Sequence, residues 1–133
     1  MMRIGLLGAG RIGRIHGLNV AARADARLVA LADASAEAAA SLAGATGAKV
    51  ATADAILADR EIDAVLICTP TDTHADLIEK AVLAGKAVFC EKPVDLDAAR
   101  IRRRARVDHG RRNQVQPVCH ARMHGHRSGS QVV

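Results

Sequence analysis

The chain has 133 residues, half of them hydrophobic, so it is long enough for one globular domain and too apolar for a disordered protein. Residues 1–99 carry ten Lys and Arg against thirteen Asp and Glu, whereas residues 100–133 carry nine Arg and one Asp. The formal charge of +5 therefore belongs to the last quarter of the chain, and it does not indicate a nucleic-acid partner for the remainder.

Short apolar runs alternate with helical patterns over the first hundred residues, which predicts parallel strands joined by crossover helices. The expected fold class is α/β, a Rossmann-type doubly wound parallel sheet over residues 1–100, incomplete at its last strand. The predicted strands cover residues 3–7, 27–32, 49–51, 64–68 and 87–90. The predicted helices cover residues 11–23, a segment from Ser35 to Gly44 or Gly47, a single turn capped by Asp54, a segment from Asp72 or Thr73 to residue 84 before Gly85, and a segment from Asp95.

A glycine-rich turn, GAGRIG at residues 8–13, follows the first predicted strand and opens the first helix. In such a turn Gly8 permits the sharp reversal, Gly10 lets the backbone approach a pyrophosphate, and Gly13 lets the helix pack closely on the strand. The phosphates then lie at the helix N-terminus, where free N–H groups and the helix dipole favour negative charge. The turn therefore predicts a dinucleotide site. Arg11 within it either contacts a phosphate or lies on the surface.

Asp33 ends the second predicted strand, 20 residues beyond Gly13. A carboxylate at this place accepts hydrogen bonds from both hydroxyls of a ribose and repels a 2′-phosphate. The sequence thus predicts NAD rather than NADP as the cofactor. The alternative interpretation is a solvated aspartate in a turn.

Two further polar segments follow predicted strands, TPTDTH at residues 69–74 and EKP at residues 91–93. Open α/β sheets bind ligands at the carboxyl ends of their strands, so we expect both segments beside the glycine turn. His16, on the first helix, is expected to be packed or on the surface rather than a ligand. His74 either contacts the cofactor or is a polar residue at a helix start. Cys68 and Cys90, at the ends of adjacent strands, are expected to be small buried hydrophobes.

Three segments together, GAGRIGRIH at residues 8–16, CTPTDTH at 68–74 and FCEKP at 89–93, resemble the glucose-fructose oxidoreductase, inositol dehydrogenase and rhizopine catabolism (Gfo/Idh/MocA) family. The resemblance covers residues 2–100. It implies that the full-length enzyme is a homo-oligomer and oxidises a polyol with NAD. Within the family, the wording of these segments favours myo-inositol as that polyol. Another sugar or polyol dehydrogenase of the same family, or a dinucleotide-binding module without catalysis, remains an alternative.

The resemblance also implies roles for individual residues. Lys92 would be the catalytic lysine that contacts the substrate hydroxyl, because a cation lowers the pKa of a nearby hydroxyl. Glu91 would help seat the nicotinamide end, and no metal is implied. The cofactor-binding residues that the resemblance implies are Gly8, Gly10, Arg11, Ile12, Gly13, Asp33, Thr69, Pro70, His74 and Glu91.

Residues 101–133 lack hydrophobic periodicity and show no convincing strand, so we expect an irregular, poorly ordered basic tail. One interpretation is a nucleic-acid-binding arginine segment. A second is a metal site formed by Cys119, His120, His124 and His126, although their spacing matches no common zinc pattern. The third, which we favour, is the product of a frameshift in a GC-rich gene. The family's second domain is not recognisable, so this chain alone is expected not to oxidise a polyol.

Cysteine usage and hydropathy predict the compartment. The three cysteines form no CxxC pair and leave an odd count, which is typical of a reducing cytosol. No apolar run approaches the ~20 residues that a membrane-spanning helix needs. We therefore expect a cytoplasmic protein with no membrane segment.

Overall fold

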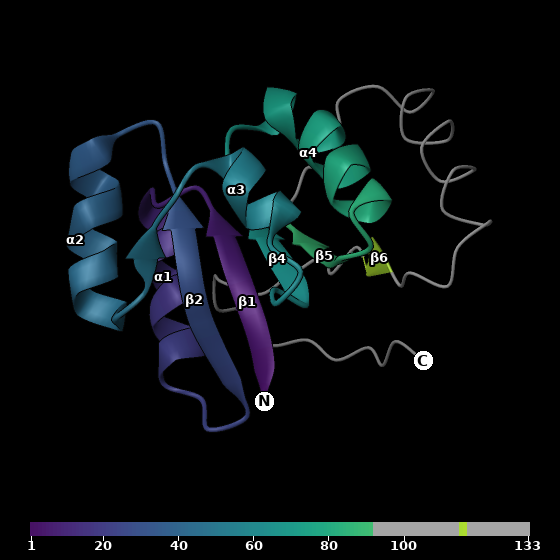
Figure 1. Ribbon diagram of the computed structural model, residues 1–133. Helices are drawn as coiled ribbons and strands as arrows, with labels where there is room; N and C mark the ends of the chain where they lie inside the picture. Colours follow the sequence, from purple (N-terminus) through teal and green to yellow (C-terminus); the bar gives the residue numbers. More distant parts are fainter. Residues whose placement is uncertain (92–114, 117–133) are drawn as a thin grey trace, which may run out of the picture.

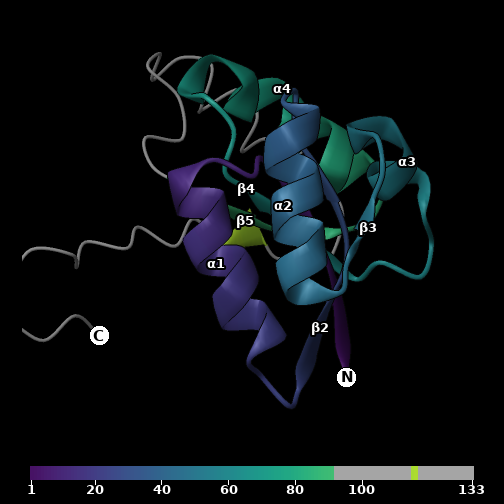
Figure 2. The same cartoon turned by 90° about the vertical axis from the view of Figure 1, so that its left-hand side faces the viewer.

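A parallel β-sheet forms the centre of the computed structural model, which describes residues 1–91 and, for their backbone, residues 115–116. Its elements in chain order are β1 (Met2–Leu7), α1 (Arg11–Ala21), β2 (Ala26–Ala32), α2 (Ala36–Thr46), β3 (Lys49–Val50), α3 (Ala53–Ala58), β4 (Ala64–Ile67), α4 (Thr71–Leu83), β5 (Ala87–Cys90) and β6 (Val115–Gln116). The strands lie in the order β3-β2-β1-β4-β5-β6 (Figure 1). Helices α1 and α2 cover one face, and α3 and α4 cover the other (Figure 2). This arrangement confirms the predicted doubly wound sheet.

The apolar runs of the central strands are explained by burial on both faces of the sheet. Successive residues of a strand point to opposite faces. Leu6 of β1 and Leu66 of β4 accordingly pack beneath α1 and α2, whereas their neighbours Leu7 and Ile67 pack beneath α3 and α4. Two hydrophobic clusters therefore enclose the sheet, and they hold the carboxyl ends of β1 and β4 side by side.

Three predicted signals of helix ends are confirmed. The Ser35 hydroxyl accepts a hydrogen bond of 3.2 Å from the backbone of α2, three residues on. Gly47 ends α2 with a φ of 74°, and Gly85 follows α4 with a φ of 78°. Left-handed backbone of this kind favours glycine.

Two helix starts differ from the prediction by one or two residues. Thr52, rather than Asp54, caps α3, because its backbone is extended and its hydroxyl accepts a hydrogen bond of 3.1 Å from Ala55. Asp54 lies in the first turn instead. Helix α4 begins at Thr71, directly after Pro70. Proline suits the entry to a helix because the backbone N–H that it lacks has no partner there.

Strand β6 is an element that the sequence pattern did not predict, and the expectation of no strand in residues 101–133 is wrong at this point. It pairs in parallel with β5. Two residues are too few to produce an alternating pattern, so the pairing depends on the backbone edge that β5 offers. The helix predicted from Asp95, the catalytic lysine Lys92 and most of the expected irregular tail, with its histidine cluster, lie outside the described residues.

A buried lysine directly before β5 bonds the segment between α3 and β4, at the end of the strands opposite the glycine turn. The Lys86 ammonium is almost fully buried and donates to the carbonyl oxygens of Asp59, at 2.5 Å, and Ile62, at 2.8 Å. Burial lowers the pKa of Lys86, whereas the nearby carboxylates of Asp59 and Asp63 raise it. Within the part of the chain that the structure describes, no helix has the length and hydropathy needed to cross a membrane.

Candidate functional site

The predicted site residues lie together at the carboxyl ends of neighbouring strands. Gly8 follows β1, Asp33 follows β2, Thr69 lies two residues beyond β4, and Glu91 follows β5. The strand order places Asp33 on one side of the glycine turn and the other two residues on the opposite side. Between β1 and β4 the crossover helices change from one face of the sheet to the other, which is where open α/β sheets bind ligands.

Two glycines of the turn are required by contacts within the protein. Gly8 has a φ of 99°, and a Cβ at this position would lie 2.6 Å from the carbonyl of Cys68. A Cβ on Gly13 would lie 1.9 Å from the carbonyl oxygen of Gly8. The start of α1 therefore packs directly on the turn and on the end of β4, as the glycine pattern predicts.

Gly10 is different, because a Cβ there would meet no protein atom within 4 Å. Its φ of −67° and ψ of −168° suit any residue, so neither packing nor backbone strain requires a glycine. Gly10 caps α1 without a side chain, and the first turn of α1 carries no acidic residue. The first N–H groups of a helix have no partner within the helix, and among residues 1–91 no side chain caps those of α1, which begin next to the open space at Gly10. An anionic group fits this position.

The residues between these glycines are exposed. Ile12 is 42% exposed, and Arg11 also lies at the surface of the turn. The structure therefore leaves the side chain of Arg11 accessible at the place where an anion would approach. Contact of either residue with a phosphate stays a prediction.

The carboxylate of Asp33 accepts hydrogen bonds from the backbone of two different segments. One carboxylate oxygen accepts a hydrogen bond of 2.6 Å from the N–H of Ala9, and the other accepts one of 2.7 Å from the N–H of Ser35. Asp33 therefore joins the glycine turn to the start of α2, a role that its sequence position did not reveal. A carboxylate has about four lone-pair sites, so both oxygens retain capacity for ribose hydroxyls.

Hydrogen bonds fix the segment that follows β4. The Thr73 hydroxyl lies 2.6 Å from the Thr69 hydroxyl and 2.7 Å from the carbonyl oxygen of Pro70. The His74 ring is buried, and its Nε2 donates to the carbonyl oxygen of Thr69 at 2.6 Å. The structure gives His74 a buried position in which it holds Thr69. Pro70 is exposed at the start of α4.

Glu91 is tied to β4 and to α1. Its backbone N–H donates to the carbonyl oxygen of Ile67 at 3.0 Å, which extends the pairing of β5 with β4. Its carboxylate bonds Nε2 of His16. The His16 ring also packs edge-on against Phe89, with ring centroids 5.3 Å apart. His16 is therefore packed, as expected, but sequence reasoning missed its partner 75 residues away.

The two cysteines at this edge lie in apolar surroundings. Cys90 is buried, and Cys68 packs against the cluster beneath α1 and α2. Burial, and then the charge of Glu91, raise the pKa of each thiol to about 12. Cys90 is thus the small buried hydrophobe that was predicted, whereas Cys68 is only partly buried. Among the residues described, no cluster of His, Cys, Asp or Glu is suited to a metal ion.

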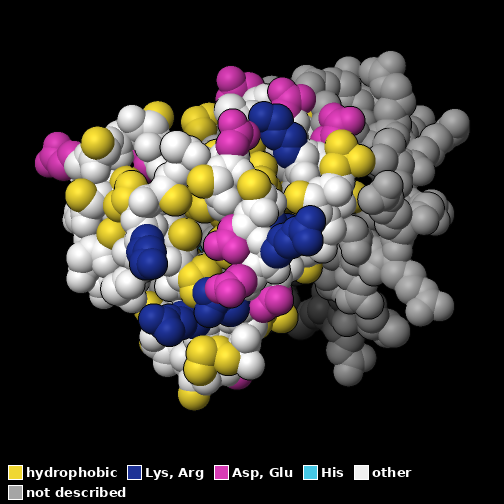
Figure 3. Space-filling model, viewed as in Figure 1, with side chains coloured by type: hydrophobic (Ala, Val, Ile, Leu, Met, Phe, Trp, Pro, Cys, Tyr) yellow, Lys and Arg dark blue, Asp and Glu magenta, His cyan; other side chains and the backbone are white. Residues whose placement is uncertain are grey.

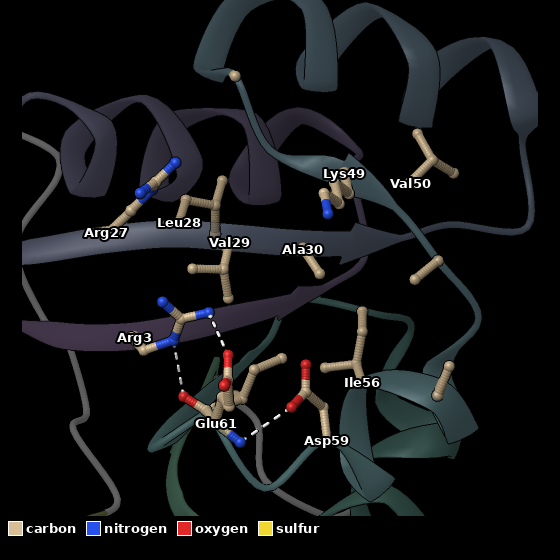
Figure 4. Close-up of a pocket in the computed structure, with 14 residues that line it drawn as sticks. Arg3, Arg27, Leu28, Val29, Ala30, Lys49, Val50, Ile56, Asp59 and Glu61 are labelled. Atoms are coloured by element: carbon tan, nitrogen blue, oxygen red, sulfur yellow. Dashed lines mark hydrogen bonds and ion pairs between the residues drawn. The ribbon is translucent and has the colours of Figure 1, made fainter.

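A separate groove of about 390 Å³ lies near the amino ends of β1 and β2, between the sheet and α3 (Figure 4). Arg3 and Glu61 point toward each other at its rim and form an ion pair of 3.0 Å. None of the predicted cofactor-binding residues lines it. Figure 3 draws one face of residues 1–91, and on this face the basic and acidic side chains are interspersed. They form no extended basic surface there.

Comparison with known proteins agrees with this arrangement. Residues 2–117 match the family described as "Oxidoreductase family, NAD-binding Rossmann fold" (Gfo/Idh/MocA). The chain is 65% identical over 101 residues to an inositol 2-dehydrogenase of Rhizobium meliloti, which is 76% of this chain and 31% of that protein. The chain thus spans about a third of the length of this relative.

Two solved structures show the same fold. A protein assigned as a myo-inositol dehydrogenase, from Sinorhizobium meliloti, superposes with a TM-score of 0.84 and 58% identity over 86% of this chain and 35% of that chain. A scyllo-inositol dehydrogenase of Lactobacillus casei, solved with NAD(H) and scyllo-inositol, superposes with a TM-score of 0.78 and 31% identity over 86% and 36%.

Proposed function

This chain belongs to the Gfo/Idh/MocA oxidoreductase family, with its NAD-binding Rossmann fold, and we propose that it holds NAD(H) for the oxidation of an inositol by the full-length enzyme. The observation that carries the proposal is the open space at Gly10, bordered by the first turn of α1 and adjoining the carboxylate of Asp33. A dinucleotide carries both groups that these two features suit, a pyrophosphate for the helix N-terminus and a ribose for the carboxylate.

Each part of the cofactor has residues suited to it. The N–H groups at the start of α1 would bind the pyrophosphate. Asp33, on the β2 side, would accept hydrogen bonds from the adenosine ribose and repel the 2′-phosphate of NADP. The nicotinamide half would then lie on the opposite side of the turn, over the ends of β4 and β5, where Thr69 and Glu91 are found.

The inositol substrate is supported by the relatives, since 65% identity connects this chain to an inositol 2-dehydrogenase. Bound NAD⁺ would supply the hydride acceptor for oxidation of a secondary alcohol. Lys92, which follows Glu91 in the sequence, would contact the substrate hydroxyl and lower its pKa. The cytoplasmic location and the homo-oligomeric state of the full-length enzyme remain proposals from the cysteine pattern and the family resemblance.

Two glycine-to-alanine substitutions test the proposed cofactor site. A Cβ meets no protein atom within 4 Å at Gly10 or at Gly44, which lies within α2. Gly10→Ala should therefore change the free energy of unfolding by less than about 1 kcal/mol but weaken NADH binding by about 10- to 100-fold, the cost of forcing a methyl group into a closely packed contact. Calorimetric titration of the 133-residue chain measures the effect.

Gly44→Ala is the matched control and should bind NADH like the unmodified chain. Its helix should become slightly more stable, because alanine is favoured over glycine within a helix by roughly 0.5–1 kcal/mol. Unchanged NADH affinity in Gly10→Ala, or an equal loss in both variants, would show that the cofactor does not approach Gly10.

A further inference from the structure

We propose that His16 is a positioning residue for the nicotinamide half of the cofactor site. Its ring holds the carboxylate of Glu91, and thereby holds the end of β5 against α1. The inference deepens the proposed function, because it assumes that the carboxyl edge of the sheet binds NAD(H). It assigns to a helix residue outside the glycine turn the task of aligning the strand end that precedes Lys92.

The His16 ring is fixed from two directions. Nε2 bonds the Glu91 carboxylate, and the ring meets Phe89 edge-on at an interplanar angle of 68°. Residues two apart on an extended strand lie on the same face, so Phe89 and Glu91 present a single surface to α1. The His16 and Glu91 side chains are only 18% and 19% exposed, which limits the alternative positions open to them.

The position of this pair relates it to one half of the cofactor. Asp33 places the adenosine ribose on the β2 side of the glycine turn, and the strand order places β4 and β5 on the other side. Glu91 therefore lies on the nicotinamide side. His16 lies three residues beyond Gly13, about 4.5 Å further along the axis of α1. One helix thus supplies the anion site with its first turn and holds β5 with its next turn.

The charge of Glu91 makes a partner necessary. Its neighbours at this edge are the thiols of Cys68 and Cys90, whose pKa values its charge helps to raise, and neither offers a positive charge. A partly buried carboxylate without a hydrogen-bond donor is costly, so it would turn toward water if His16 were lost. The backbone bond from Glu91 to Ile67 would still join the strand end to β4, but the side-chain bond that joins it to α1 would be gone.

The experiment compares NADH with ADP-ribose, which lacks the nicotinamide ring, in calorimetric titrations of the 133-residue chain. The unmodified chain should prefer NADH by about tenfold. His16→Leu should abolish most of this preference while changing ADP-ribose affinity by less than about twofold, the range of a surface substitution. His16→Gln, whose amide also donates to a carboxylate, should restore it. Asn19→Ala, at an exposed position of α1, is the control and should keep the full preference.

The alternative role, simple stabilisation of the fold, predicts an equal loss of affinity for both ligands. An equal loss of affinity for both ligands would therefore overturn the inference. So would an unchanged preference for NADH in His16→Leu, or no preference for NADH in the unmodified chain. If His16→Leu does not fold, Glu91→Ala is titrated instead, and it should lose the preference in the same way; a retained preference again overturns the inference. Failure of the unmodified chain to bind either ligand would instead refute the proposed cofactor site.

Discussion

Replacement of Gly13 by alanine is expected to lower the free energy of unfolding by about 3 kcal/mol, at the upper end of overpacking effects. The added Cβ would lie 1.9 Å from the carbonyl oxygen of Gly8 and 2.8 Å from its carbonyl carbon. These are backbone atoms, so no side-chain rotation can relieve the overlap. Either α1 or the glycine turn must move, and the hydrophobic cluster beneath α1 must move with it.

Denaturant unfolding of the 133-residue chain measures this effect. Gly10→Ala and Gly44→Ala are matched controls, since each adds the same methyl group where no protein atom lies within 4 Å. Both should unfold within about 1 kcal/mol of the unmodified chain. A Gly13→Ala variant as stable as these controls would contradict the close packing of α1 on the turn.

Replacement of Lys92 by alanine is expected to abolish most catalysis in an enzyme that has both domains. Such an enzyme can be made by joining residues 1–100 of this chain to the remainder of the Rhizobium meliloti inositol 2-dehydrogenase, to which the chain is 65% identical over 101 residues. The chimera should reduce NAD⁺ with myo-inositol. Lys92→Ala should lower its kcat by about 10²–10⁴-fold, the contribution typical of a positioned acid or base.

Lys80→Ala provides the control for the loss of a lysine. Lys80 is 60% exposed on α4, and its ion pair with Asp54 spans 3.6 Å. Exposed pairs of this kind contribute about 0–1 kcal/mol, so activity should be unchanged. A Lys92→Ala chimera that retains its kcat would contradict the catalytic role, and a chimera inactive toward inositols would contradict the proposed substrate class.

Much of the fold follows from local sequence patterns. Strands buried on both faces require continuous apolar runs, which is why β1 and β4 were recognisable. The glycine turn and Asp33 were recognisable because backbone geometry and ligand chemistry restrict them to particular residue types and spacings. Gly47 and Gly85 marked helix ends because both adopt a positive φ.

The features that the sequence did not predict depend on contacts between segments that are distant along the chain. The bond between His16 and Glu91 requires both the rotation of α1 about its axis and the placement of β5 two strands from β1, and neither is encoded by a local pattern. Likewise, the carboxylate of Asp33 bonds the backbone of Ala9, and a backbone donor leaves no signature in residue type. Strand β6 was missed because its two residues are too few for periodicity.

The central claim is that the carboxyl edge of the sheet binds NAD(H), with Asp33 beside the adenosine ribose. Parallel calorimetric titrations of the unmodified chain with NADH and with NADPH test it most directly. We predict one NADH bound per chain, with an affinity at least about tenfold higher than that for NADPH, because the Asp33 carboxylate repels a 2′-phosphate. Absence of NADH binding, or tighter binding of NADPH, would contradict the claim.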